Sequence, residues 1–265
     1  MTEDKFTYYM TGRHFENESS TLPKEISKEV ILEAQNLSAK GFEDVSFQLH
    51  KGEILGVTGQ LGSGRTELSL SLFGLNRPVS GKIIMEGQEV SLNSVQEAQK
   101  LKIALVPEDR LTEGLFIPQS ITDNITVTRL NSLSNMGVLN KGRLMNEAST
   151  WVEKLEIATK NPTNAAGTLS GGNQQKVVLA KWLSDNPKIL ILNGPTVGVD
   201  IGAKYDIHKL LKQLAMQGMS IIVVSDDTAE VVSLCDRAIV MQGGKMTGAL
   251  EKEDLNTVNL NKATV

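Results

Sequence analysis

The sequence predicts an α/β fold with a mostly parallel β-sheet, an antiparallel β part near the N-terminus and an inserted helical part. An apolar stretch at residues 54–57 runs into a glycine-rich turn and then into a helical stretch at residues 66–73. This is the strand–loop–helix unit of phosphate-binding folds. Farther along, apolar strands alternate with helical patterns, as in parallel sheets that helices cover on both faces. The alternating stretches are residues 189–192, 203–216, 221–224 and 238–241.

The remaining elements divide the chain. Residues 30–34 and 45–49 alternate apolar and polar side chains, which favours two half-buried strands. A middle section from about residue 95 to 170 carries helical patterns, and we expect it to be a helical subdomain inserted in the core. Residues 1–28 are predicted to be a linker or arm, and residues 29–265 to be the folded domain.

Composition restricts the partners. The net charge of −4 lacks the basic footprint of phosphate-backbone binding, so we expect no nucleic-acid partner. The longest apolar runs are of strand length, well short of the roughly 20 residues that span a bilayer. The single cysteine, Cys235, excludes a disulfide within the chain and fits a reducing compartment. We therefore expect a cytoplasmic protein whose membrane association is peripheral.

The glycine-rich turn is the first motif that carries chemistry. It matches the phosphate-binding loop pattern, except that arginine stands at the lysine position. Glycines there let backbone N–H groups and the following helix N-terminus face a di- or triphosphate, and the hydroxyl of Thr66 is placed to bind Mg²⁺. A tight turn without a ligand is the alternative for this motif alone. Its residues are Gly59, Gln60, Leu61, Gly62, Ser63, Gly64, Arg65 and Thr66.

A second motif opens a predicted helix much later in the chain. It consists of Leu169, Ser170, Gly171, Gly172, Asn173 and Gln174. The motif resembles the signature motif of ABC ATPases, and the resemblance covers the chain from about Val30 to its end. It implies a P-loop NTPase fold that binds ATP and Mg²⁺. A serine-capped helix whose glycines serve packing is the alternative for the motif alone.

The resemblance also marks departures from the family. Its apolar strand ordinarily ends in Asp-Glu, where Asp steadies Mg²⁺ and Glu positions the attacking water. Asn193 and Gly194 stand at these positions. Asparagine carries no charge, and glycine has no side chain that could act as a base. Loss of a general base typically costs about 10²- to 10⁴-fold in rate, so we expect catalysis at this site to be weak or absent.

Further positions near the nucleotide differ or stay open. Asp226 takes the place of the histidine that senses the γ-phosphate, and a carboxylate there would repel that phosphate. The alternative is helix capping, because Asp227 and Glu230 have capping-box spacing. Glu108 replaces the glutamine that links Mg²⁺ to the membrane partner, with a solvated loop as the alternative. Phe42 is the candidate to stack on adenine, with core packing as the alternative.

A closer resemblance points to one subfamily. Residues 106–110, 62–67, 198–204 and 10–13 are similar to the second nucleotide-binding half of monosaccharide-importer ATPases of the ribose, galactose and xylose type. Such halves normally carry arginine in the phosphate loop. The resemblance implies three partners: a second nucleotide-binding half, membrane permease subunits and a periplasmic or extracellular sugar-binding protein. It places the chain at the cytoplasmic face of the membrane, and it leaves ribose, galactose, xylose and nucleosides open as cargo.

The altered residues are sorted by role. Those that the chain would use on its own nucleotide are changed: Arg65, Glu108, Asn193, Gly194 and Asp226. Residues 195–200 resemble the family's D-loop, a segment that contacts the nucleotide of the partner half. The residues that the chain would lend to a partner's nucleotide, the signature residues and Asp200 of this D-loop, are intact. We therefore predict an ATP-binding half with a degenerate site that completes a partner's catalytic site.

Three alternatives remain. This half could hydrolyse ATP itself, with water positioned by Glu108, Asp226 or Asp227. The chain could also be a non-transport ATPase of the same family, in translation or DNA repair, or a purely structural binding module.

Overall fold

The structure, a computed structural model, describes residues 26–135 and 137–264. Most of the predicted arm, residues 1–25, therefore lies outside the described residues. The first strands form an antiparallel sheet in the order β2-β1-β4-β5, as the alternating polarity predicts. Its strands are β1 (Val30–Ala39), β2 (Phe42–His50), β4 (Ser80–Met85) and β5 (Gln88–Val90).

The larger sheet has the order β12-β11-β3-β10-β9-β6. All its neighbouring strands run parallel except the pair β11 and β12. The mostly parallel sheet confirms the predicted fold class. Its strands are β3 (Ile54–Thr58), β6 (Ile103–Val106), β9 (Ile189–Asn193), β10 (Ser220–Val224), β11 (Arg237–Gln242) and β12 (Lys245–Leu250).

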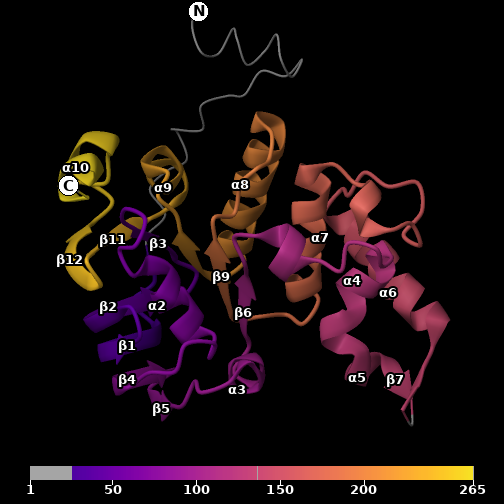
Figure 1. The fold of residues 1–265 in the computed structure, drawn as a ribbon, viewed down its shortest axis with the longest axis horizontal. Helices are drawn as coiled ribbons and strands as arrows, with labels where there is room; N and C mark the ends of the chain where they lie inside the picture. Colours follow the sequence, from indigo (N-terminus) through magenta and orange to yellow (C-terminus); the bar gives the residue numbers. More distant parts are fainter. Residues whose placement is uncertain (1–25, 136, 265) are drawn as a thin grey trace, which may run out of the picture.

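Helices cover both faces of this sheet (Figure 1). Leu190 and Leu192 of β9 face a cluster formed with α7, α8 and α9, whereas Ile189 and Ile191 face a cluster formed with α2 and the antiparallel sheet. Burial on both faces explains why these strands are apolar without alternation. The helices outside the inserted part are α2 (Arg65–Leu72), α3 (Val95–Lys100), α7 (Gly171–Leu183), α8 (Ile201–Met216), α9 (Thr228–Leu234) and α10 (Thr257–Ala263).

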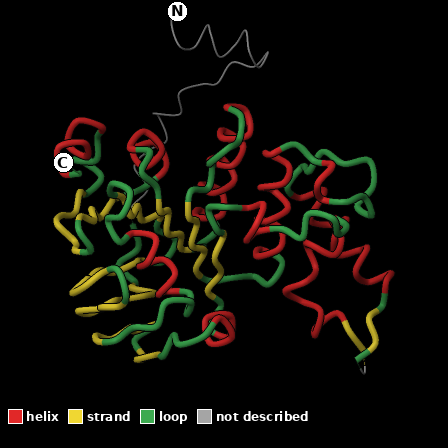
Figure 2. The backbone as a smooth tube through the Cα atoms, viewed as in Figure 1, coloured by secondary structure: helices red, strands yellow, loops and turns green. Residues whose placement is uncertain are grey.

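The helical part forms a separate lobe, seen as the helix-rich side of Figure 2. The predicted boundary near residue 95 is too early, because β6 pairs with β9 inside the large sheet. The lobe begins after that strand. No helix of the described residues is both long and apolar enough to span a bilayer. The lobe contains η1 (Arg110–Gly114), α4 (Ile121–Thr126), η2 (Val127–Arg129), α5 (Leu130–Leu133), β7 (Ser134–Asn135), β8 (Val138–Leu139), α6 (Lys141–Lys154) and η3 (Ala166–Thr168).

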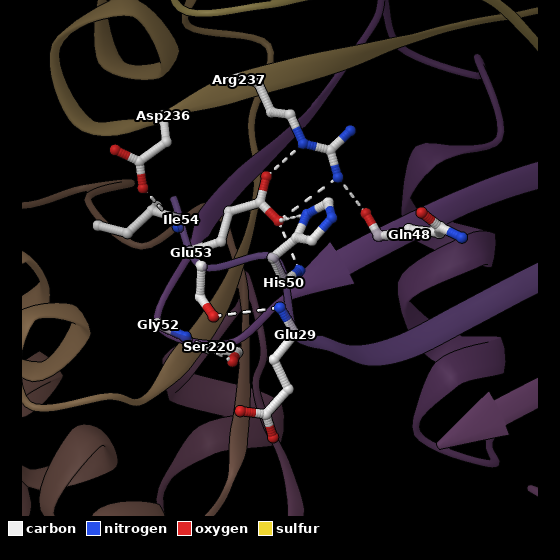
Figure 3. Close-up of polar contacts among 10 residues, drawn as sticks. Glu29, Gln48, His50, Gly52, Glu53, Ile54, Ser220, Asp236 and Arg237 are labelled. Carbon is white, nitrogen blue, oxygen red and sulfur yellow. Dashed lines mark hydrogen bonds and ion pairs between the residues drawn. The ribbon is translucent and has the colours of Figure 1, made fainter. Parts of the chain in front are cut away.

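A buried polar cluster joins the two sheets where β3 begins (Figure 3). Glu53 is 1% exposed, and its carboxylate accepts hydrogen bonds from the backbone N–H of His50, at 2.6 Å, and from Arg237 at the start of β11. Arg237 also donates to the carbonyl oxygen of Gln48 in β2. Asp236 accepts from the backbone N–H of Ile54 at 2.9 Å. These bonds fix the start of β3 and thus the direction in which it delivers its loop.

Replacing Glu53 with glutamine should destabilise the fold strongly. The substitution leaves the guanidinium of Arg237 without its anionic partner in a buried setting, which costs about 3 kcal/mol of unfolding free energy. Urea unfolding measures this loss. Glu86→Gln is the matched control, because Glu86 pairs with Lys188 while both side chains are about half exposed, so it should cost less than about 1 kcal/mol. Equal losses in both variants would contradict the structural role of the cluster.

Candidate functional site

The candidate site lies at the carboxyl edge of the large sheet, where the loops after several parallel strands meet. Val57 of β3 is level with Val224 of β10, and Val224 is level with Asn193 of β9. The backbone N–H of Gly194 donates to the carbonyl oxygen of Val224 at 2.8 Å. Ligands of open α/β sheets bind at this edge. The register therefore gathers the glycine loop, Asp226, Gly194 and the segment after β6.

The glycine loop is shaped by close backbone approach. A Cβ atom on Gly59 would lie 2.2 Å from the carbonyl oxygen of Met241. A Cβ atom on Gly64, which has a left-handed φ of +94°, would lie 2.7 Å from the carbonyl oxygen of Gly41. Neither position accepts a side chain. Gly62, by contrast, has open space where its Cβ would be, so the outer face of the loop is accessible to an anion.

Arg65 points back into its own loop. Its side chain is 7% exposed, and its guanidinium donates to the carbonyl oxygen of Gly59. A second guanidinium nitrogen lies 3.3 Å from the carboxylate of Asp226, which is 64% exposed. The structure thus pairs two positions that the sequence presented as separate departures. The positive charge at the lysine position of the loop pattern therefore already has an anionic partner.

Replacing Asp226 with asparagine should tighten ATP binding. The substitution removes a negative charge beside the loop and frees the guanidinium of Arg65, which is worth on the order of 1 kcal/mol at a partly exposed site, or about a fivefold lower Kd. Titration of the full chain with a fluorescent ATP analogue measures it. Asp185→Asn is the control, because Asp185 pairs with Lys102 at the opposite edge of the sheet. An unchanged or higher Kd in Asp226→Asn would contradict the expectation.

Glu108 and Gly194 also occupy one place. Gly194 has a left-handed φ of +59°, and a Cβ atom on it would lie 3.0 Å from Cγ of Glu108 and 2.8 Å from Cγ2 of Val197. The Cδ of the Glu108 carboxylate is 3.6 Å from the same point. The side chain of Glu108 therefore fills the space that a residue at position 194 would use. Asn193, 6% exposed, precedes this contact at the end of β9.

The signature residues and the D-loop form one packed junction. A Cβ atom on Gly172 would lie 2.5 Å from Cβ of Ala203, so the starts of α7 and α8 touch. Asp200 caps α8 by accepting the backbone N–H of Ala203 at 2.9 Å. Ser170 is exposed and makes no side-chain cap to α7, and its hydroxyl accepts from the amide of Asn173 at 2.9 Å. Ser170 therefore occupies the N-cap position of α7, but its hydroxyl does not cap the helix.

The other predicted contacts lie around the glycine loop. Phe42 is 4% exposed and packs in the cluster beneath the antiparallel sheet, which is the core-packing alternative. Thr66, half-buried, is in the first turn of α2, while Gln60 and Leu61 are exposed and Ser63 is buried. At the signature, Leu169 packs against the core and Gln174 is buried.

Capping of α9 falls to Asp227, which accepts the backbone N–H groups of Ala229 at 3.0 Å and Glu230 at 3.1 Å. Hydrogen bonds with Lys204 and with these N–H groups outweigh burial and lower the pKa of Asp227. Asp226, one residue earlier, does not cap α9 and pairs with Arg65 instead.

Glu230 is a site residue that sequence reasoning missed. Its carboxylate is buried and accepts hydrogen bonds from Thr196, from Ser225 at 2.7 Å and, at 3.1 Å, from His208. Burial raises its pKa, but these hydrogen bonds outweigh burial, so the pKa of Glu230 is lowered. The carboxylate thus ties the stretch before the D-loop to α8 and α9. Capping-box spacing was the only sequence signal, and it indicated a different partner.

The chain belongs to the ABC transporter family, whose sequence pattern matches residues 42–197. In this chain the glycine loop after β3 exposes Gln60, Leu61 and Gly62, and the signature at the start of α7 exposes Ser170.

Within the family, the sequence of the chain is similar to sugar import ATP-binding proteins. The chain is 41% identical over 98% of its length to a ribose import ATP-binding protein of Rhizobium johnstonii, and 41% identical over 97% to a xylose import ATP-binding protein of Photobacterium profundum. It spans about half the length of these relatives, 51% and 52%.

Solved structures show the same fold. A nucleotide-free ATP-binding cassette from an ABC transporter superposes with a TM-score of 0.76 at 20% identity, covering 88% of this chain and 95% of the other. A cassette in its ADP conformation gives 0.74 at 21% identity, covering 89% and 96%.

Proposed function

We propose that this chain is a nucleotide-binding half of an ABC-type sugar importer, with a degenerate ATP site of its own and an intact signature that completes a partner's site. The observation that carries the proposal is the contrast between the two surfaces. At the carboxyl edge of the sheet, Arg65 is paired with Asp226 and Gly194 offers no base. At the start of α7, Ser170 is exposed and the neighbouring D-loop residue Asp200 caps α8.

Nucleotide binding remains compatible with the altered loop. The open space at Gly62 and the buried hydroxyl of Ser63, which has no hydrogen-bond partner in the described part of the chain, fit a phosphate that approaches the loop. Mg²⁺ usually keeps several waters and takes few protein ligands beside the phosphates. The hydroxyl of Thr66 would hold it. When bound, the ion would offset phosphate charge.

The relatives and the half-length match support the proposed partners. The chain spans about half of the sugar import proteins that it resembles. We propose that it corresponds to the second half of such a tandem protein, which the arginine in its phosphate loop favours, and that it pairs with a catalytically competent half. In this proposal the chain binds membrane permease subunits from the cytoplasmic face, and an external sugar-binding protein completes the importer.

Replacing Ser170 with arginine should abolish ATP turnover by the complex of this chain with a competent half. A bulky cation at the signature would block the surface that closes over the partner's nucleotide, lowering kcat at least about 10²-fold. Steady-state ATPase assays measure the change. Ser233→Arg, a substitution of the same size on α9, is the control and should leave turnover near its original value. Full turnover in Ser170→Arg, or fast turnover by this chain alone, would contradict the proposal.

The contact between Glu108 and Gly194 favours a second candidate function, ATP hydrolysis by this half itself. The Glu108 carboxylate lies beside the position from which the family's base would extend. In that case the carboxylate of Glu108 would orient the attacking water. The missing side chain at Gly194 would leave the space that Glu108 needs.

A complex whose partner half has lost its catalytic base distinguishes the two functions. The degenerate-site proposal expects turnover at background, with no further change in Glu108→Gln. Remaining turnover that falls about 10²-fold in Glu108→Gln would instead support hydrolysis at this site. Glu113→Gln, which removes a nearby exposed carboxylate, is the control. Single-turnover ATPase measurements give both rates.

A further inference from the structure

A single π-helical turn, η1, follows Glu108 and is the first element of the helical lobe, next to the carboxyl edge of the sheet. Asp109 caps this turn by accepting the backbone N–H groups of Leu111 at 2.9 Å and Thr112 at 3.2 Å. A hydrogen bond from the hydroxyl of Thr112 and the two backbone bonds lower the pKa of Asp109. π-Helical turns are rare overall, and those that occur are often found at functional sites.

The side chain of Arg110 bridges from this turn to two other elements. Its guanidinium donates to the carbonyl oxygens of Val197 at 2.9 Å and Gly198 at 3.1 Å, just before the D-loop aspartate. Its Nε donates to the side-chain oxygen of Gln174 in α7 at 3.4 Å. One planar cation thus touches the D-loop and the signature helix together, which suits the fixed fork of donors in arginine.

Glycines make room for this bridge. A Cβ atom on Gly171 would lie 2.8 Å from a guanidinium nitrogen of Arg110 and 3.1 Å from the carbonyl oxygen of Gly198. A Cβ atom on Gly198, whose φ is +67°, would lie 3.2 Å from the other terminal nitrogen. The first glycine of the signature therefore has a function inside this chain, in addition to any contact with a nucleotide.

The other end of the turn is held by Lys181 of α7. Its ammonium, on a side chain that is almost completely buried, donates to the carbonyl oxygen of Gly114 at 2.6 Å. Burial lowers the pKa of Lys181 to about 8. Gly114 itself lies against Val178, 3.2 Å from its would-be Cβ. The π-helical turn is therefore attached to the signature helix at its first and last residues.

We propose that Arg110 is a positioning residue for the surface that this chain lends to its partner. It sets the D-loop and the first turn of α7 in one arrangement and ties both to the turn that carries the exposed side chain of Leu111. Displacement of that turn would move the signature and the D-loop together. This role rests on the proposed function, because it acts on ATP at the partner's site.

Hydrogen exchange in the full chain tests the bridge directly. In Arg110→Ala, the backbone N–H of Val197, which donates to Gly194, should exchange at least about fivefold faster because its segment loses two bonds. Arg110→Lys, with one compact ammonium, should give an intermediate rate. Arg129→Ala is the matched control, because Arg129 pairs with Glu147 inside the helical lobe and should leave this amide unchanged. Unchanged exchange in Arg110→Ala overturns the bridge.

ATP turnover by the complex with a competent half tests the positioning role. Arg110→Ala should lower kcat at least about tenfold while KM for ATP changes less than about twofold, and Arg110→Lys should restore part of the rate. The melting temperature should match that of Arg129→Ala. Unchanged kcat, in a complex that Ser170→Arg inactivates, overturns the positioning role but not the proposed function. If Ser170→Arg leaves turnover intact, the proposed function fails and the positioning role fails with it, whereas the exchange result still decides the bridge.

Discussion

The parallel backbone ladder of β3, β10, β9 and β6 is the constraint on which the site depends. Each strand hydrogen-bonds to its neighbour in register, so the loops at their carboxyl ends occupy fixed places beside one another. The Glu53 cluster anchors the opposite end of β3. The register of the strands determines which loop residues lie side by side. A changed side chain in one loop therefore contacts a side chain from the neighbouring loop.

The departures from the family pattern show this accommodation in pairs. The carboxylate of Asp226 alone would repel a phosphate, but it forms an ion pair with the guanidinium of Arg65. Gly194 lacks a side chain, and that of Glu108 occupies the vacant volume. Within each pair, one change is sterically or electrostatically compatible with the other. The altered residues of the site therefore pack against one another. The carboxylate of Asp226 is not free, because it is paired with Arg65.

The large sheet and the glycine loop could be predicted because their signals are local. An apolar run such as residues 189–192 fits only a strand buried on both faces, and the glycines mark positions where backbone segments approach closely. The boundary of the helical part was placed too early because β6 is a short apolar run inside a polar section. The contacts of Arg110 and Glu230 could not be predicted because their partners are remote in sequence: Arg110 and Val197 are 87 residues apart. Only the fold brings them together.

An intact signature motif is by itself weak support for a functional signature, because packing explains part of it. Gly171 makes room for Arg110, and Gly172 for Ala203, so packing inside this chain also favours glycine at both positions. Ser170 differs. It is exposed, its side chain does not cap α7, and its hydroxyl accepts a hydrogen bond from the side chain of Asn173. Because internal packing does not require a serine there, Ser170 is the residue of the motif whose identity the proposed contact with a partner's nucleotide explains best.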